Sequence, residues 1–243
     1  MSKTFTSNVF QSTYKDDFRD SDNYHRVLFN SGRAIQAREL TQLQTIIQEE
    51  IGRFGRNIFL DGSAVNPGGP HVNSNYEFIK LDTSVRTLPD DTSSLLGLEF
   101  THSATSTAVR ILEVVPATGS DPATLYVQYT NTSGGSVGTN PVRMNAGVDI
   151  SSGSFTFTVQ STNTIANPAV GQGCQVSNAA GDFFTRGHFV FAKPQSLIIS
   201  KYTRYPTKTI GFRVTEDIVT VADTNELYDN QGANPNLSSP GAD

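Results

Sequence analysis

The sequence predicts a mainly β protein with one long N-terminal amphipathic helix, followed by small β modules, sandwich-like or barrel-like, arranged in series. Three observations predict this class. Ser, Thr, Asn and Gly are abundant and only 17% of residues are charged, a balance that favours short strands and turns. Between Ile35 and Phe59, apolar residues recur at helical spacing. Beyond residue 60, short apolar or alternating runs are separated by turn-forming residues.

Residues 1–34 are predicted to form an N-terminal docking arm. Their aromatic residues stand among Asp, Asn and Ser without helical or strand periodicity. Large aromatic side chains in such a segment bury area only if a partner surface receives them. The candidate interface residues of the arm are therefore Phe10, Tyr14, Phe18 and Tyr24.

Residues 35–60 are predicted to form the amphipathic helix. Its apolar stripe has spacings of 3, 4, 4, 3 and 4 and consists of Leu40, Leu43, Ile47, Ile51, Phe54 and Ile58. Gly55 is expected to weaken the last turns, so that the helix frays or bends there. Two interpretations of the stripe remain open: it covers the chain's own sheet, or it forms a short parallel coiled coil between copies. Under the second interpretation, the candidate interface residues are Leu40, Leu43, Ile47, Ile51 and Phe54.

Three β segments are predicted to follow the helix. Residues 61–100 form a connecting segment with a strand at 76–81. Residues 101–170 form a polar β module, since Ser, Thr, Asn and Gly supply 32 of these 70 residues and charged side chains only five. Residues 171–243 form a second β module with an extended C-terminal tail. Its predicted strands are at 189–192, 197–199, 210–214 and 218–221, and a hairpin turn is predicted at 193–196.

Composition argues against several classes of partner. The net charge is −5, from 23 acidic and 18 basic residues, so the excess of cations that phosphate neutralisation needs is missing and nucleic acid is not expected as a partner. No run approaches the ~20 apolar residues of a membrane span, and the first residues lack a secretory core. The single cysteine, Cys174, excludes an internal disulfide and fits cytosolic synthesis.

The residues that could carry chemistry are scattered. The four histidines, His25, His71, His102 and His188, lie too far apart for a local metal-ligand pair. The acidic cluster Asp16, Asp17, Asp20 and Asp22 lacks the Gly and the distal Glu of a calcium loop. Four carboxylates are available for glycoside cleavage, but a pair is specific only once its separation is known; they are Asp90, Asp91, Glu99 and Glu113.

Two further combinations have a structural and a functional interpretation. Cys174 and His188 can be a nucleophile and its base, although a buried structural cysteine is the commoner outcome. Residues 201–205 alternate cations and aromatics as single-strand binders do, and a half-buried strand has the same pattern. No catalytic residue, cofactor or metal site is therefore expected, and the chain is not expected to be an enzyme.

Two stretches resemble a family of large tail-fibre and baseplate-associated structural proteins of tailed bacteriophages, especially those of contractile-tailed cyanophages. The first is the run from Asp22 to Gln44, Asp-Asn-Tyr-His-Arg-Val-Leu-Phe-Asn-Ser-Gly-Arg-Ala-Ile-Gln-Ala-Arg-Glu-Leu-Thr-Gln-Leu-Gln, continuing to Asp61-Gly62. The second runs from Gly187 through Arg213-Val-Thr-Glu-Asp-Ile-Val-Thr to Ser239-Pro-Gly-Ala-Asp243. Together they cover a little over half of the chain, and residues 101–170 lie outside the resemblance.

The resemblance implies a virion protein made in the host cytoplasm that links the tail or baseplate to a longer fibre. It implies a homo-oligomer, with a trimer favoured, other tail or baseplate proteins as partners, chain continuing beyond residue 243, and no catalytic residues. Two alternatives stay open. In one, the loops of residues 101–170 bind a host surface glycan. In the other, the chain is a polysaccharide depolymerase.

Overall fold

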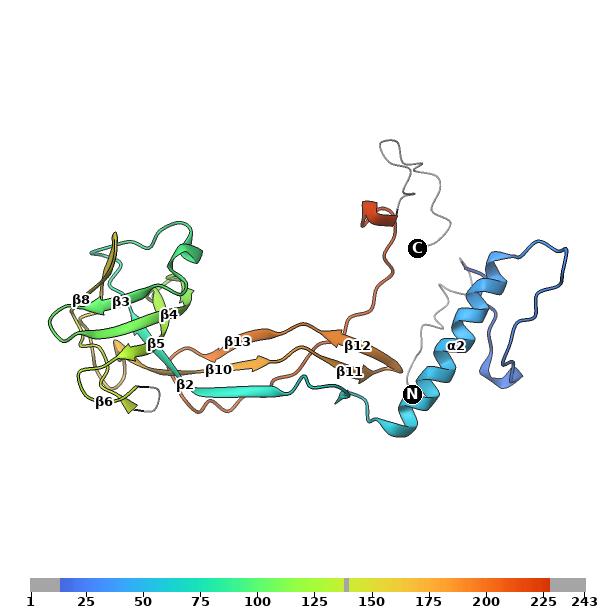
Figure 1. Ribbon diagram of the computed structural model, residues 1–243, viewed down its shortest axis with the longest axis horizontal. Helices are drawn as coiled ribbons and strands as arrows, with labels where there is room; N and C mark the ends of the chain where they lie inside the picture. Colours follow the sequence, from blue (N-terminus) through green and yellow to red (C-terminus); the bar gives the residue numbers. More distant parts are fainter. Residues whose placement is uncertain (1–13, 138–139, 228–243) are drawn as a thin grey trace. The chain divides into compact units, whose positions relative to one another are not determined.

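The computed structural model describes residues 14–137 and 140–227 (Figure 1). These residues form antiparallel sheets and one α-helix, which confirms the prediction of a mainly β protein with a helix. The sequence suggested an N-terminal helix. The helix α2 (Ala37–Ile58) instead follows 36 residues of chain. The chain divides into two compact units, Met1–Pro206 and Thr207–Asp243, which are described separately.

Six strands of the first unit form a sheet that closes on itself. In order of pairing they are β2 (Pro70–Lys80), β5 (Thr124–Asn131), β4 (Thr107–Val115), β3 (Glu99–His102), β8 (Asp149–Ser152) and β9 (Phe155–Thr158). The sheet closes where Leu81, just after β2, forms a bridge with Val159, just after β9. The backbone N–H of Asp82 donates to the carbonyl of Thr158 at 2.8 Å beside this bridge. Closure leaves β9 without a free edge at this point.

The core lies inside this closed sheet because strand side chains alternate between faces. Ile79 and Leu81 point inward and pack with Phe100, Leu125 and Ile150, all at most 1% exposed. The outer face of β2 is covered as well. There Tyr76 stacks on Tyr126 with ring centroids 4.7 Å apart, and Phe78 meets Tyr202 at 4.9 Å.

A long hairpin extends from this sheet. β10 (Val170–Asn178) and β11 (Gly181–Thr185) form one side, and β12 (His188–Ala192) and β13 (Gln195–Ser200) form the other. Arg186 and Gly187 join the two sides with φ of 51° and 91°, the positive pair that a two-residue type I′ turn requires. β2 and β1 (Ser63–Ala64) pair along β10 and β11 as the third strand of this ribbon.

Two local predictions for the second β module are wrong. The expected hairpin turn at 193–196 lies midway along one side of the hairpin, because β12 on β11 and β13 on β10 keep one register from Gln175 to Thr185. The expected strands at 210–214 and 218–221 are irregular chain. Alternating apolar residues are compatible with a strand but do not supply the hydrogen-bonded neighbour that a strand needs.

The sheets also cross the boundaries expected between segments. β2, from residues 61–100, pairs with β5 of residues 101–170 on one side and with β10 on the other. Strand patterns in a sequence locate strands without naming their partners, so they did not reveal that one sheet joins all three β segments. The remaining short elements are η1 (Asp20–Asp22), η2 (Thr92–Leu95), β6 (Gly135–Ser136), β7 (Asn140–Pro141) and, in the second unit, η3 (Asn225–Leu227).

Candidate functional site

The most distinctive surface of the described residues is the apolar face of α2, which consists of Leu40, Leu43, Ile47, Ile51, Phe54 and Ile58. The helix begins with a capping box, in which the side chains of Gln36 and Glu39 satisfy each other's backbone N–H groups. Ile47, Ile51 and Phe54 are 51%, 47% and 65% exposed, and Leu43 is half-buried. Apolar stripes of amphipathic helices normally face a core. Among the described residues of the first unit, the stripe of α2 instead remains largely exposed.

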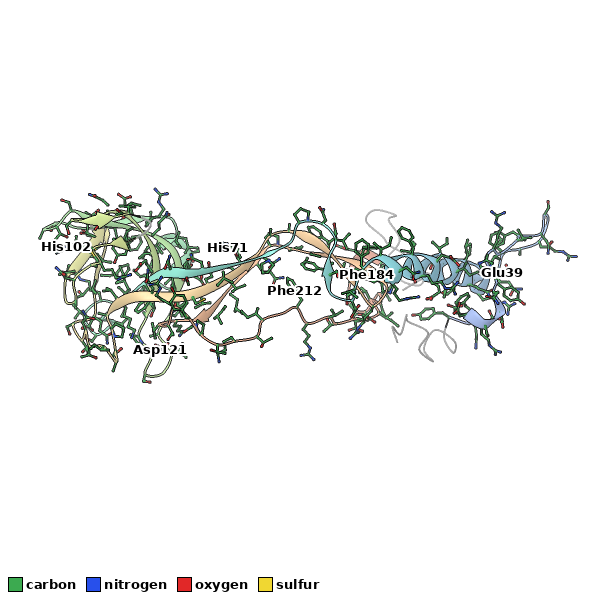
Figure 2. All side chains as sticks on the ribbon, turned by 90° about the horizontal axis from the view of Figure 1, so that it is seen from below. Glu39, His71, His102, Asp121, Phe184 and Phe212 are labelled. Atoms are coloured by element: carbon green, nitrogen blue, oxygen red, sulfur yellow. The ribbon has the colours of Figure 1, made fainter. Side chains whose placement is uncertain are left out.

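The opposite side of α2 packs on the tip of the hairpin. Gly52 and Gly55 are buried there, and Phe184, at the end of β11, lies against Gly55 (Figure 2). The Phe184 ring is 1% exposed and lies between Phe59 and Phe189, with centroids at 5.9 and 5.2 Å. Gly55 therefore lets the helix approach the ribbon and does not fray it, since α2 continues to Ile58. Two glycines three residues apart, outside the stripe, were the sequence signal for this contact.

The arm before α2 is also held by that helix. The carboxylate of Asp16, 7% exposed, accepts hydrogen bonds from Thr45 Oγ1 at 2.5 Å and from the backbone N–H of Phe18 at 3.1 Å. Asp17 forms an ion pair with Arg38 at 3.2 Å. Exposed ion pairs contribute only ~0–1 kcal/mol each, so the half-buried Asp16–Thr45 bond is the stronger anchor.

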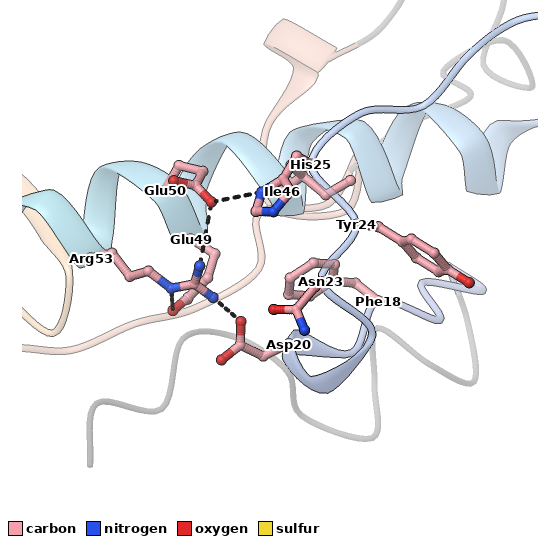
Figure 3. A pocket seen from close by; sticks show the side chains of 9 residues that line it. All are labelled: Phe18, Asp20, Asn23, Tyr24, His25, Ile46, Glu49, Glu50 and Arg53. Carbon is pink, nitrogen blue, oxygen red and sulfur yellow. Dashed lines mark hydrogen bonds and ion pairs between the residues drawn. The ribbon is translucent and has the colours of Figure 1, made fainter.

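Figure 3 shows how the middle of the arm lies on α2. Asp20 pairs with Arg53, and the ring of His25 lies 3.5 Å from Glu50. The cavity between the arm and the helix measures about 10 Å³, roughly the space of one water molecule. It is therefore a packing gap. The acidic cluster of the arm, which lacked a calcium-loop pattern, attaches the arm to α2 through three of its carboxylates.

The predicted interface residues of the arm differ in how far they are exposed. Phe18 is half-buried and lines the gap beside Ile46. Tyr14 is half-buried, whereas Tyr24 is 60% exposed. Phe10 lies outside the described residues. Docking of the arm on another protein stays a prediction, and for its described part Tyr24 is the most accessible aromatic.

The combinations considered for metal binding and catalysis are not assembled. Within residues 14–137 and 140–227, no group of three or more His, Cys, Asp or Glu side chains is arranged to hold a metal ion. His71 lies on the ribbon and His102 in the closed sheet (Figure 2), where His102 contacts Thr105 at 3.0 Å. Cys174 is buried in β10, and His188 pairs with Thr185 at the tip. Eleven residues of strand separate Cys174 from that tip, roughly 36 Å, so the two do not form a dyad.

The carboxylates considered for glycoside cleavage have structural contacts. Asp91 caps η2 by accepting from Ser93 N at 3.0 Å and Ser93 Oγ at 2.6 Å, and these bonds lower its pKa. Glu113 accepts from the hydroxyl of Tyr76 at 3.1 Å. Glu99 is exposed and pairs across β3 and β4 with Arg110. Asp91, Glu113 and Glu99 therefore each have a different partner, which is Ser93, Tyr76 and Arg110 respectively.

The cation and aromatic pattern at 201–205 attaches the chain to the closed sheet. Tyr202 donates to Asp121 at 2.6 Å, and the Lys201 ammonium binds the same carboxylate. Burial raises the pKa of Tyr202 to about 12, and the bond to Asp121 adds to this. Burial opposes ionisation of Asp121, but bonds from Lys201 and Tyr202 outweigh it and lower its pKa. Lys80 donates to Asn167 at 2.6 Å and lies 3.9 Å from the Tyr202 ring centroid, and desolvation lowers its pKa.

Glu77, 7% exposed, receives two hydrogen bonds from Arg143 at 2.6 and 2.9 Å and one from Gln172 at 2.6 Å. This network links β2, β10 and the loop before β8, and the hydrogen bonds to Glu77 raise the pKa of Arg143.

An open groove of about 510 Å³ lies between residues 83–89 and the strand β9. No helix of the described ranges is long and apolar enough to cross a membrane.

The comparisons with known proteins single out the same N-terminal part. A family described as a domain of unknown function (DUF4815) matches residues 12–85. The match includes the described arm, α2, β1 and β2. No curated protein matches the chain. No solved structure matches it either. The matched region thus contains the apolar face of α2 together with the arm that covers the helix on another side.

Proposed function

We propose that the chain is a non-catalytic structural connector of a bacteriophage tail, which assembles with copies of itself through the apolar face of α2. The observation that carries this proposal is the orientation of α2. Ile46, Gly52 and Gly55 are buried against its own chain, whereas Leu40, Ile47, Ile51, Phe54 and Ile58 are about half exposed or more. A face of this composition and length is typical of an association surface.

The energetics favour a partner for this face. Full burial of an aliphatic or aromatic side chain contributes roughly 1.5–3 kcal/mol, so burying the exposed half of six side chains contributes about 5–9 kcal/mol per copy. A pair would gain about 10–18 kcal/mol, against an association cost of about 4–15 kcal/mol. The estimated gain exceeds the cost over most of these ranges, so burial of this face can drive association.

The phage context rests on the resemblance of residues 22–62 and 187–243 to tail-fibre and baseplate-associated proteins. The structure adds support of a general kind. A fibre connector needs a symmetric apolar interface and sheets with few free edges. The exposed apolar face of α2 suits such an interface, and the bridge between Leu81 and Val159 removes one free edge. In this proposal the arm contacts the tail or baseplate and the closed sheet leads toward the fibre.

Light scattering on the purified chain tests the association. We expect a mass that is a multiple of the 26.3 kDa monomer, and we expect the double variant Ile47→Glu, Ile51→Glu to be monomeric. The matched control is Ser133→Glu, Thr162→Glu, which adds the same charge at exposed positions outside α2. A monomeric wild-type chain, or equal loss of mass in both variants, would refute self-association through this face.

A separate measurement tests the location. Peptide mass spectrometry of purified particles of the encoding virus should detect this chain at a ratio to the tail proteins that stays constant through density-gradient purification. Loss of the chain at that step would argue against a virion protein.

A second candidate function, binding of a host surface glycan, is favoured by the open groove of the closed sheet. Val85 is 60% exposed at its rim, Phe155 is half-buried, and Arg86 lies 3.8 Å from Asp149. Apolar surface beside charged hydrogen-bonding groups suits a sugar ring. A glycan array probed with the wild-type chain and with Arg86→Ala tests this function. Silence across host polysaccharides would count against it.

A further inference from the structure

Lys80 ends β2 with a side chain that the fold buries. The residue is 3% exposed and shares the outer face of the strand with Phe78, because residues two apart in a strand point to the same side. The described partners of its amine are neutral. The amine donates to Oδ1 of Asn167 at 2.6 Å and lies 3.9 Å from the ring centroid of Tyr202. Lysine is seldom buried without a carboxylate partner, and here the amine meets an amide instead.

The backbone holds the side chains of Lys80 and Asn167 together. The N–H of Lys80 donates to the carbonyl of Ala169 at 2.8 Å, two residues after Asn167. Asn167 is fixed in turn by Thr164, whose Oγ1 accepts from the Asn167 N–H at 3.0 Å and whose N–H donates to the Asn167 carbonyl at 3.1 Å. Two groups held in contact react as if at very high concentration, because folding has already removed the entropy of bringing them together. The fold therefore presents the amine to the amide continuously.

The surroundings of the Lys80 amine favour its uncharged, nucleophilic form. Desolvation lowers the pKa of Lys80, and the carboxylate of Asp121 opposes this shift only in part. Tyr202, whose ring covers the amine, is fixed by donating its hydroxyl to Asp121 at 2.6 Å. A desolvated lysine can act as a nucleophile. A reaction that occurs once per chain and becomes irreversible when its leaving group departs needs only a minor fraction of uncharged amine.

From this contact we infer that Lys80 and Asn167 join in an intramolecular isopeptide bond. The lone pair of Nζ forms a bond to Cγ of Asn167, and the bond from Cγ to Nδ2 breaks. One amine hydrogen moves to the departing nitrogen, so that ammonia leaves and an amide joins the two side chains. No oxidant, metal or other reactant enters this balance. Asn167 lies at the surface, from which ammonia can escape.

The bond ties the end of β2 to the loop before β10 and closes the chain between residues 80 and 167. β2 and β10 are neighbours in the sheet, so the bond resists their separation when the hairpin is pulled. This inference goes beyond the proposed function, and it holds or fails whether or not copies of the chain associate.

Intact-mass spectrometry of the purified full chain, incubated until its mass no longer changes, tests the bond. We expect the wild-type chain to be lighter by one ammonia than the 26.3 kDa of its sequence. Trypsin should then release residues 57–86 and 144–186 as one joined peptide, because Lys80 in the bond is no longer cleaved. Lys80→Arg and Asn167→Ala should each have the full mass of their sequence. The matched control is Lys193→Arg, at an exposed lysine of the ribbon, which should keep the deficit.

Two results would overturn the inference. A wild-type chain with the full mass of its sequence lacks the bond, and this result needs no variant to fold. A wild-type chain that is lighter by one ammonia but releases residues 57–80 and 144–186 separately has closed a succinimide between Asn167 and its own backbone. In that case the deficit would persist in Lys80→Arg, whereas the isopeptide bond requires its loss.

Discussion

Replacing Gly55 with alanine sets two well-characterised effects against each other in one substitution. Alanine is the better helix former by about 1 kcal/mol. However, a Cβ on Gly55 would lie 2.7 Å from Cζ of Phe184 and closer still to Cε2. The Phe184 ring is 1% exposed and lies between two other phenylalanine rings, so it has no free space to enter.

Overpacking of this kind costs about 1–3 kcal/mol, which exceeds the gain in helix propensity. We therefore expect Gly55→Ala to destabilise α2 by up to about 2 kcal/mol. In a Phe184→Ala background the obstructing ring is gone, so the same substitution should stabilise the helix by about 1 kcal/mol. The matched control is Gly52→Ala. Its Cβ would meet the flexible end of Arg56 at 3.0 Å and the carbonyl of Gly187 at 3.4 Å, so a neutral or stabilising effect is expected.

Urea denaturation followed by circular dichroism at 222 nm is the suitable assay, because α2 is the one α-helix of the described residues. A double-mutant cycle of Gly55→Ala and Phe184→Ala then isolates the coupling between the two positions. If Gly55→Ala stabilises the helix equally in both backgrounds, the close packing of α2 on the hairpin tip is refuted.

Two further predictions concern the closed sheet. Glu77→Gln should destabilise the chain by about 3 kcal/mol. This is the lower end of the range for a buried ion pair, because the side chain of its partner Arg143 is 31% exposed. Urea denaturation measures the loss, and an equal effect of Glu99→Gln at an exposed site would argue against this prediction. Burial raises the pKa of Tyr129 and of Tyr202 to about 12. Because these pKa values exceed the unfolded value near 10, their stabilisation is complete below about pH 10 and lost as pH rises to about 12. The tyrosinate absorbance of Tyr129 and Tyr202, measured as the difference from a Tyr129→Phe, Tyr202→Phe variant, should therefore change together with circular dichroism in that range. A difference signal well below it in the folded chain would refute the burial of these hydroxyls.

Much of the fold was predictable because local patterns determine it. The helical spacing from Leu40 to Ile58 located α2 to within two residues at each end of the predicted range 35–60. The alternation in residues 76–81 located the buried end of β2. Which strand pairs with which depends on contacts between distant residues. The pairing of β2 with both β5 and β10 has no local signal, so the three expected β segments did not appear as one sheet.

The site was predictable in part for the same reason. The residues of the apolar face followed from spacing, but their exposure did not, because the sequence fitted a sheet-covering helix equally well. Gly55 was interpreted as a weak point since glycine lowers helix propensity. Its actual contribution is the close approach of Phe184, which depends on a residue 129 positions further along the chain. The acidic residues of the arm were similarly ambiguous until Thr45 and Arg38 were found beside them.

The arrangement on α2 explains why a helix so apolar on one side can remain exposed in a single chain. A stripe of this kind normally turns inward because burial in the chain's own core is the nearest source of stabilisation. In α2, the side that packs on the chain makes contacts that the large side chains of the stripe cannot make. Gly52 and Gly55 give the hairpin tip room that no larger side chain would leave, and Thr45 binds the carboxylate of Asp16. Rotating the stripe inward would break these contacts and place Ile51 or Phe54 against a ring that has no space. The contacts of Gly52, Gly55 and Thr45 thus explain why the apolar face of α2 stays exposed among the described residues, and another subunit at this face is what we propose.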